Sequence, residues 1–169
     1  MKVTIAALNI TKGFLKIVEE EFKKLLQAIT VLRSNILEEM EDTIVLIPEH
    51  TPVNASLLGN APSLRLVQCG AGYDYVDLEA ADKKGVFVSN ASGVNKFAVA
   101  EHTFALILAL AKKIVSLNQS MKNGEWKHTE DIAIELNGKT IGIIGLGNIG
   151  KEVAKRALAF GMKVQTVRR

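Results

Sequence analysis

The chain has 169 residues, 48% hydrophobic and 23% charged, with a formal net charge of +3 at pH 7. This composition is that of a globular protein with one domain or two small ones, and it argues against disorder. The positive charge is spread along the chain without a lysine-rich run, so nucleic-acid binding has little support. A single cysteine, Cys69, excludes an internal disulfide and fits a reducing cytoplasm, where we expect a soluble protein. The most apolar segment, residues 97–111, contains Glu101 and His102 and falls short of a membrane span.

Residues 1–91 alternate between predicted strands and predicted helices. Strands are expected over 2–8, 29–33, 42–48, 64–69 and 86–90, and helices over 12–27, 34–40, 54–58 and 76–84. We expect Ser34 to cap the second helix. Such alternation is typical of a parallel α/β sheet. Five strands in this length predict a flavodoxin-like unit with the strand order 2-1-3-4-5.

One long helix is expected over residues 96–120, where apolar residues recur at helical spacing. Positions on the opposite side, Val99, Ala105 and Leu110, are apolar too. The sequence therefore predicts that most of this helix is buried, as at a seam between domains or subunits. A polar loop is expected to follow it, to about residue 138.

A glycine-rich motif follows the strand expected over residues 139–144. It runs Gly145-Leu146-Gly147-Asn148-Ile149-Gly150 and precedes a helix expected over 151–161. This spacing between a strand and a helix is the dinucleotide-binding fingerprint. Gly145 would allow the tight turn, Gly147 would let the backbone approach a pyrophosphate, and Gly150 would let the helix pack on the strand. The alternative is a purely structural turn.

The strand expected over residues 162–167 ends in Arg168 and Arg169. A chain that prefers NAD usually has Asp or Glu near this point, to bind the ribose 2′-hydroxyl. A guanidinium cannot accept a hydrogen bond from that hydroxyl, but it can bind a 2′-phosphate through two hydrogen bonds. The sequence therefore favours NADP, with NAD as the alternative, and the two arginines could also be only a solvated terminus.

Several spaced segments resemble the D-isomer-specific 2-hydroxyacid dehydrogenases. The family's substrate-loop signature resembles PSLRLVQCGAGYDYVD at 62–77, and its interdomain crossover resembles VSNASGVN at 88–95 followed by VAEH at 99–102. Residues 123–126 and 135–140 then lead into the fingerprint in the family's order. The resemblance spans roughly residues 42–167. It implies a flavodoxin-like substrate domain, residues 1–95, and a Rossmann NAD(P)-binding domain, residues 96–169, truncated after its second strand.

The resemblance also implies roles for single residues. Ala71 and Gly72 would offer backbone N–H groups to the carboxylate of a small 2-keto or 2-hydroxy acid, with Ala71 also near the nicotinamide. Asn148 and Ile149 would contact the pyrophosphate through their backbone. A glycine-rich loop at the carboxyl edge of a parallel sheet suits an anion on physical grounds, because ligands bind at that edge and bare amides bind anions.

The family's catalytic arginine, carboxylate and histidine lie beyond the position of Arg169, so no residue of this chain is expected to be catalytic. His50, His102 and His128 are expected to be structural or solvated. Glu101 and His102 do not form a dyad, because adjacent helical residues point about 100° apart. Glu101 is instead expected to make an interdomain hydrogen bond.

Two further features of the sequence bear on chemistry. Cys69 ends a strand and is expected to behave as a small hydrophobe rather than as a nucleophile. The turn Pro48-Glu49-His50 departs from the Arg-Ser common at that place in phosphoglycerate dehydrogenases, which weakens the case for a phosphorylated substrate. No metal site is expected.

Three functions are compatible with the sequence. The first is the amino-terminal part of an NAD(P)-dependent D-2-hydroxyacid dehydrogenase, inactive alone. The second is a non-catalytic, nucleotide-gated binding module that resembles the C-terminal-binding-protein corepressors. The third is one half of a split enzyme. We also expect the second domain to expose apolar surface and to form a homodimer built on the long helix and the truncated sheet, as the resemblance also implies.

Overall fold

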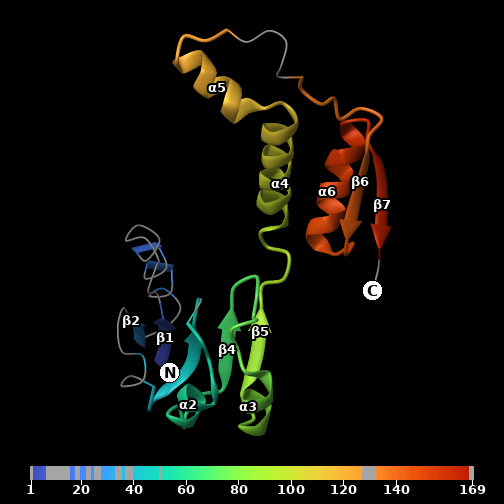
Figure 1. The fold of residues 1–169 in the computed structure, drawn as a ribbon. Coiled ribbons are helices and arrows are strands. Elements are labelled where there is room, and N and C mark those ends of the chain that lie inside the picture. The colour runs from blue at the N-terminus through green and yellow to red at the C-terminus, as the bar shows by residue number, and fades with distance from the viewer. Residues whose placement is uncertain are drawn as a thin grey trace. The chain divides into compact units, whose positions relative to one another are not determined.

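The computed structural model describes residues 2–6, 16–17, 20–21, 24, 28–32, 36, 40–49, 51–126 and 132–167. The chain divides into two compact units, Met1–Ser92 and Gly93–Arg169 (Figure 1). Among the described residues, no helix has both the length and the apolar character needed to cross a membrane.

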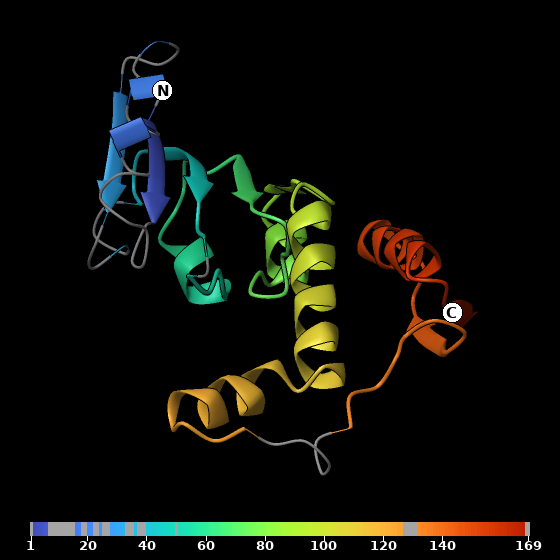
Figure 2. The ribbon, with the colours of Figure 1, turned by 90° about the horizontal axis from the view of Figure 1, so that it is seen from above.

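The first unit contains a five-stranded sheet in which every neighbouring pair is parallel. Its strands are β1 (Lys2–Ala6), β2 (Ala28–Leu32), β3 (Thr43–Ile47), β4 (Leu66–Cys69) and β5 (Phe87–Asn90). They lie in the order β2-β1-β3-β4-β5 (Figures 1 and 2). The predicted flavodoxin-like order is confirmed.

Two short helices of this unit begin at side chains that cap them. The first, α2 (Ala55–Gly59), follows Asn54, whose side-chain oxygen accepts a hydrogen bond from the Leu57 N–H at 3.0 Å. The second, α3 (Leu78–Lys83), follows Asp77, which accepts from the Ala80 N–H at 2.9 Å. Such caps satisfy N–H groups that have no partner within the helix. The helices predicted over 12–27 and 34–40, with the cap at Ser34, lie largely outside the described residues.

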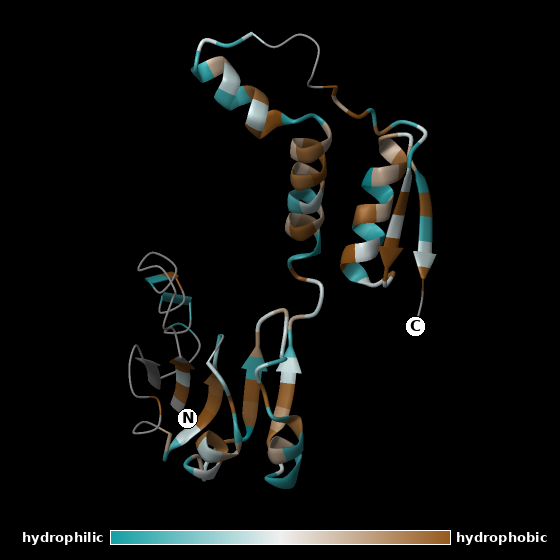
Figure 3. Ribbon diagram, viewed as in Figure 1, coloured by the Kyte–Doolittle hydropathy of each residue, from teal (hydrophilic) through white to brown (hydrophobic). Residues whose placement is uncertain are grey.

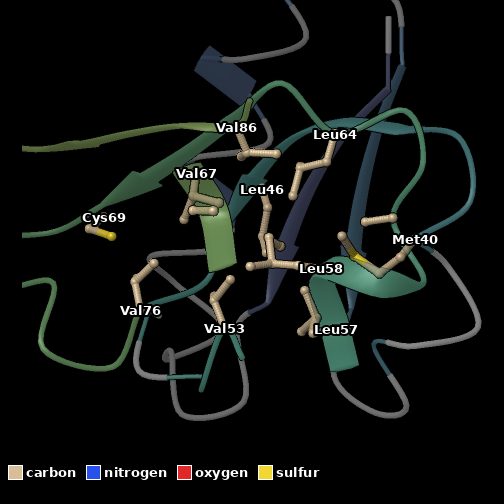
Figure 4. Packing of buried hydrophobic residues seen from close by; sticks show 12 residues of the cluster. Met40, Leu46, Val53, Leu57, Leu58, Leu64, Val67, Cys69, Val76 and Val86 are labelled. Carbon is tan, nitrogen blue, oxygen red and sulfur yellow. The ribbon is translucent and has the colours of Figure 1, made fainter. Parts of the chain in front are cut away.

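The core of the first unit lies between the sheet and these helices (Figure 4). Burying one side chain of the size of valine or leucine stabilises a fold by about 1.5–3 kcal/mol. The buried cluster fixes the ends of β4 and β5, where Cys69 pairs with Asn90. Its members come from β3, β4, the two helices and the segments before and between these elements: Met40, Leu46, Val53, Leu57, Leu58, Ala61, Leu64, Val67, Cys69, Val76, Ala81 and Val86.

The second unit contains two parallel strands and three helices among its described residues. Its elements are α4 (Lys96–Ala111), α5 (Ile114–Lys122), β6 (Thr140–Ile144), α6 (Asn148–Ala159) and β7 (Lys163–Val167). The strands β6 and β7 pair in register from Thr140 and Lys163 onward. A strand, a glycine-rich turn and a helix therefore follow one another as predicted.

The prediction of a single helix over residues 96–120 is wrong. The chain leaves the helical path at Lys113, which has a φ of 52°. The carbonyl of Ala111 accepts a hydrogen bond from the Ile134 N–H at 2.7 Å. In a continuous helix that carbonyl would accept from residue 115 instead. The backbone N–H of Ile134 thus replaces the donor that the next helical turn would have supplied.

Within the single chain, α4 is buried only in part, so the burial predicted for a seam between subunits stays a prediction. Three residues of α4, Ala100, Phe104 and Ala111, are buried, and they share a core with Val153 and Ala157 of α6. The ring centroids of Phe104 and Phe160 lie 5.3 Å apart in a stacked arrangement. Leu106 and Leu110 on the other sides are 54% and 81% exposed. Figure 3 shows hydrophobic residues along much of α4. The expected exposed apolar surface is therefore present.

Charged side chains join α4 to α6. The buried Glu152 carboxylate accepts hydrogen bonds from Lys155 at 2.7 Å and from Arg156 at 3.2 Å. Arg156 also donates to Glu101 of α4 at 3.1 Å. Glu101 was expected to bond between domains, and its partner instead belongs to the same unit. The hydrogen bond from Lys155 holds the pKa of Glu152 below its ordinary value of 4.5.

Acid should destabilise the second unit at α6, because the folded unit binds a proton at Glu152 less readily than the unfolded chain does. The stabilising contribution is fully present above pH 4.5 and is lost as the pH falls through the lowered pKa of Glu152. We expect the difference in melting temperature between the wild type and Glu152→Gln to shrink below that pH.

The matched control is Glu79→Gln, which removes the charge from an exposed pair with Lys83 on α3. It should change the melting temperature little at any pH. A difference between wild type and Glu152→Gln that stays constant between about pH 6 and pH 3 would contradict the prediction.

Candidate functional site

The turn between β6 and α6 has the backbone that the fingerprint requires. Gly145 has a φ of 90°, which is in the region that favours glycine, and its N–H donates to the Val167 carbonyl at 3.0 Å. Gly147 is the residue that precedes α6. The helix begins at Asn148, earlier than the predicted start at residue 151. Asn148 and Ile149 therefore lie in the first turn, where N–H groups have no partner within the helix.

The three glycines of the turn differ in what surrounds them. A β-carbon on residue 150 would collide with the carbonyl oxygen of Gly145 and would crowd Ile143. A β-carbon on residue 147 would meet nothing within 4 Å. Gly150 therefore serves close packing of helix on strand, whereas Gly147 keeps the backbone bare where a ligand could approach. This division of roles fits a bound pyrophosphate.

A further glycine, Gly93, supports the turn from the start of the same unit. Its φ is 76°, and a β-carbon on it would lie 2.6 Å from Nδ2 of Asn148. The side chain of Asn148 therefore lies against the Gly93 backbone. Sequence reasoning placed Gly93 in the crossover motif without giving it a role, since nothing local shows that it meets the fingerprint.

A second candidate region follows β4 in the first unit. Ala71 is half-buried and Gly72 is exposed, and both lie at the carboxyl edge of the parallel sheet. The position of a β-carbon on residue 72 is 3.3 Å from Oδ2 of Asp74. The negative charge of Asp74 therefore favours the approach of an anion to Gly72 from the side away from this carboxylate, because like charges repel.

Tyr75 anchors the far end of this loop. Burial, together with a hydrogen bond to Cys69, raises the pKa of Tyr75 to about 12. The hydroxyl therefore stays protonated at neutral pH and can donate. Cys69 is buried at the end of β4, as expected of a small hydrophobe. The N–H of Val53 donates to the Tyr75 carbonyl at 2.9 Å, which ties the loop to the segment before α2.

Some residues considered from the sequence cannot be placed. Arg168, Arg169, His50 and His128 lie outside the described residues. His102 is on α4 and is exposed in this chain, which fits a solvated side chain. In the part of the chain that the structure describes, no three His, Cys, Asp or Glu side chains come together to hold a metal ion.

Comparisons with known proteins agree on one family. Residues 104–169 match the NAD-binding domain of the D-isomer-specific 2-hydroxyacid dehydrogenases. A glyoxylate reductase from Thermococcus litoralis is 41% identical over 141 residues, which cover 78% of this chain and 43% of that protein.

Two solved structures have the same fold over nearly the whole chain. D-Lactate dehydrogenase from Aquifex aeolicus, complexed with NAD and lactic acid, matches 99% of this chain with a TM-score of 0.87 and 30% identity. An acyclic imino acid reductase, in complex with NADPH and D-Arg, matches 100% of it with a TM-score of 0.85 and 28% identity. The chain spans 52% and 56% of these two proteins, respectively. It belongs to the D-isomer-specific 2-hydroxyacid dehydrogenase family.

Proposed function

We propose that this chain supplies the substrate loop and the dinucleotide-binding turn of an NAD(P)-dependent D-2-hydroxyacid dehydrogenase. The observation that carries the proposal is the turn after β6, in which Gly150 packs against Gly145 while Gly147 leaves open space. A bound nicotinamide dinucleotide would exchange a hydride with C2 of the substrate. The chain's own part is to bind and to orient.

The turn would hold the pyrophosphate through backbone groups. The N–H groups of Asn148 and Ile149 lie at the start of α6, where the helix dipole favours negative charge. Gly145 and Gly150 set the path of the turn, and Gly147 leaves room for the phosphates. These five residues form the pyrophosphate-binding set that we propose.

We propose NADP as the preferred dinucleotide. Arg168 and Arg169 directly follow β7, and a guanidinium matches the extra 2′-phosphate of NADP. One related structure contains NADPH and another contains NAD, so the family's fold accommodates both. Titration with NADPH and NADH of the wild type and of Arg168→Asp would show the preference, and an unchanged ratio of the two affinities would refute the role of Arg168.

The proposed substrate is a small 2-keto or 2-hydroxy acid. Its carboxylate would accept hydrogen bonds from the N–H groups of Ala71 and Gly72, and Ala71 would also border the nicotinamide. The exposure of Gly72 at the carboxyl edge of the sheet supports this placement. Glu49, in the turn after β3, brings a negative charge that does not suit a phosphorylated substrate.

The chain by itself is expected to reduce 2-keto acids no faster than a control without protein. No residue of this sequence takes the place of the family's catalytic arginine, carboxylate and histidine. Proton transfer by such groups contributes about 10²–10⁴-fold to a rate, and orientation contributes more. The measurement is the oxidation of NADPH and NADH with glyoxylate, hydroxypyruvate and pyruvate. Turnover of about 1 per second or faster would contradict the proposal that this chain is inactive alone.

We also propose a homodimer that uses the exposed side of α4 and α5. Leu110 and Val115 are 81% and 74% exposed there, and Ile144 at the end of β6 is 92% exposed. We take these exposed apolar side chains on α4, α5 and β6 as the sign of an interface. Sedimentation at micromolar concentration should give a dimer, and Leu110→Glu should shift it toward a monomer. A wild type that sediments only as a monomer would refute the interface.

Two glycine substitutions should separate folding from binding. Gly150→Ala forces a β-carbon into the Gly145 carbonyl, so we expect it to destabilise the second unit by about 2 kcal/mol or more. Gly147→Ala meets open space, so the melting temperature should hardly change while the affinity for NADPH falls about tenfold. Calorimetric melting and NADPH titration measure the two effects. Unchanged NADPH affinity in Gly147→Ala would count against the proposed phosphate site.

A further inference from the structure

The substrate loop is held by two hydrogen bonds from the end of β5. The backbone N–H of Ala91 donates to the Gly70 carbonyl at 2.9 Å. The side-chain amide of Asn90 donates to the Ala71 carbonyl at 2.8 Å. Two successive peptide carbonyls of the loop are therefore both turned toward β5.

Because peptide units are planar, the directions of these two carbonyls also fix the directions of two N–H groups. In a trans peptide the N–H points opposite to the carbonyl of the same peptide unit. The Gly70 carbonyl shares its peptide with the Ala71 N–H, and the Ala71 carbonyl shares its peptide with the Gly72 N–H. Holding both carbonyls toward β5 therefore directs both N–H groups away from β5, on one side of the loop.

These two N–H groups are free to bind. Among the hydrogen bonds of the described residues, none has the Ala71 or the Gly72 N–H as its donor. Two neighbouring backbone N–H groups that point the same way form an anion-binding concavity. Without the Asn90 bond, the peptide between Ala71 and Gly72 could rotate, and its N–H would lose its direction.

We propose that Asn90 is a positioning residue for substrate binding. Its side chain orients the Gly72 N–H toward the carboxylate of a 2-keto acid, while the Ala91 N–H does the same for Ala71. This inference rests on the proposed function for the identity of the ligand, but the orientation of the loop can be tested without any ligand. Asn90 lies at the end of β5, opposite Cys69, so the parallel register places it beside the loop.

The probe is Asn90→Leu, which keeps the shape of the side chain and removes the donor. Asn90→Ala serves as a second variant if the leucine variant does not fold. The matched control is Asn60→Leu at the end of α2, because the Asn60 side-chain amide also donates to a backbone carbonyl, that of Ser56 at 2.9 Å. The full chain, labelled with ¹⁵N, is titrated with glyoxylate and followed by the amide signals of Ala71 and Gly72.

Wild type and Asn60→Leu should show glyoxylate-dependent shifts at both amides. Asn90→Leu should weaken glyoxylate binding about 3- to 10-fold, the range expected for loss of one hydrogen bond. It should lose the shift at Gly72 more than the shift at Ala71, which Ala91 still holds. Equal affinity and equal shifts in wild type and Asn90→Leu would overturn the proposal.

A wild type that does not respond to glyoxylate would refute the proposed substrate site but not the role of Asn90. The amide order parameters of the ligand-free proteins then test whether Asn90 holds the peptide between Ala71 and Gly72. The Gly72 order parameter should fall in Asn90→Leu and stay unchanged in Asn60→Leu, because only the former releases the Ala71 carbonyl. An unchanged Gly72 order parameter in Asn90→Leu would overturn the positioning role.

Discussion

The approach of the Gly150 backbone to the carbonyl of Gly145 is the constraint on which the second unit depends. Only a residue without a β-carbon allows α6 to begin so soon after β6. Because the helix begins at Asn148, the N–H groups of its first turn stand at the carboxyl end of the strand. The same short connection keeps Val153 and Ala157 over the sheet, where they share a core with Phe104 of α4. The packing of α6 and the position of its first N–H groups thus have one cause.

Backbone carbonyls recur as the groups that decide local structure in this protein. The Ala111 carbonyl, bonded to Ile134, ends α4. The Ala71 carbonyl, bonded to Asn90, fixes the direction of a loop in the first unit. In each case a residue distant in sequence donates a hydrogen bond to a carbonyl that would otherwise bond to a nearby donor. Since a buried unpaired carbonyl is costly, such long-range bonds select one backbone path among several.

The sequence was sufficient for the features that follow from periodic patterns. Alternating strands and helices predicted the parallel sheet and its order, and the apolar run before Gly145 predicted β6. The glycine spacing predicted the turn because each glycine meets a local requirement. These inferences use only neighbours along the chain and the general rules of parallel sheets.

Features that depend on distant contacts were not predictable. No glycine or proline marks the break at Lys113, because the cause is Ile134, which lies beyond α5. The side chain of Glu101 accepts a hydrogen bond from Arg156 on α6, and no local sequence pattern connects these two residues. The role of Asn90 follows from the register of β5 against β4, and the Asn148 contact with Gly93 from the path of the crossover. Each requires the coordinates of two segments at once.

The central claim is that the backbone at the start of α6 binds a dinucleotide pyrophosphate. The most direct measurement is a titration of the ¹⁵N-labelled chain with NADPH, followed by its amide signals. The account predicts that the amides of Gly147, Asn148 and Ile149 shift first and furthest, and that added pyrophosphate competes for them. Shifts confined to other parts of the chain, or no shifts at millimolar NADPH, would contradict it.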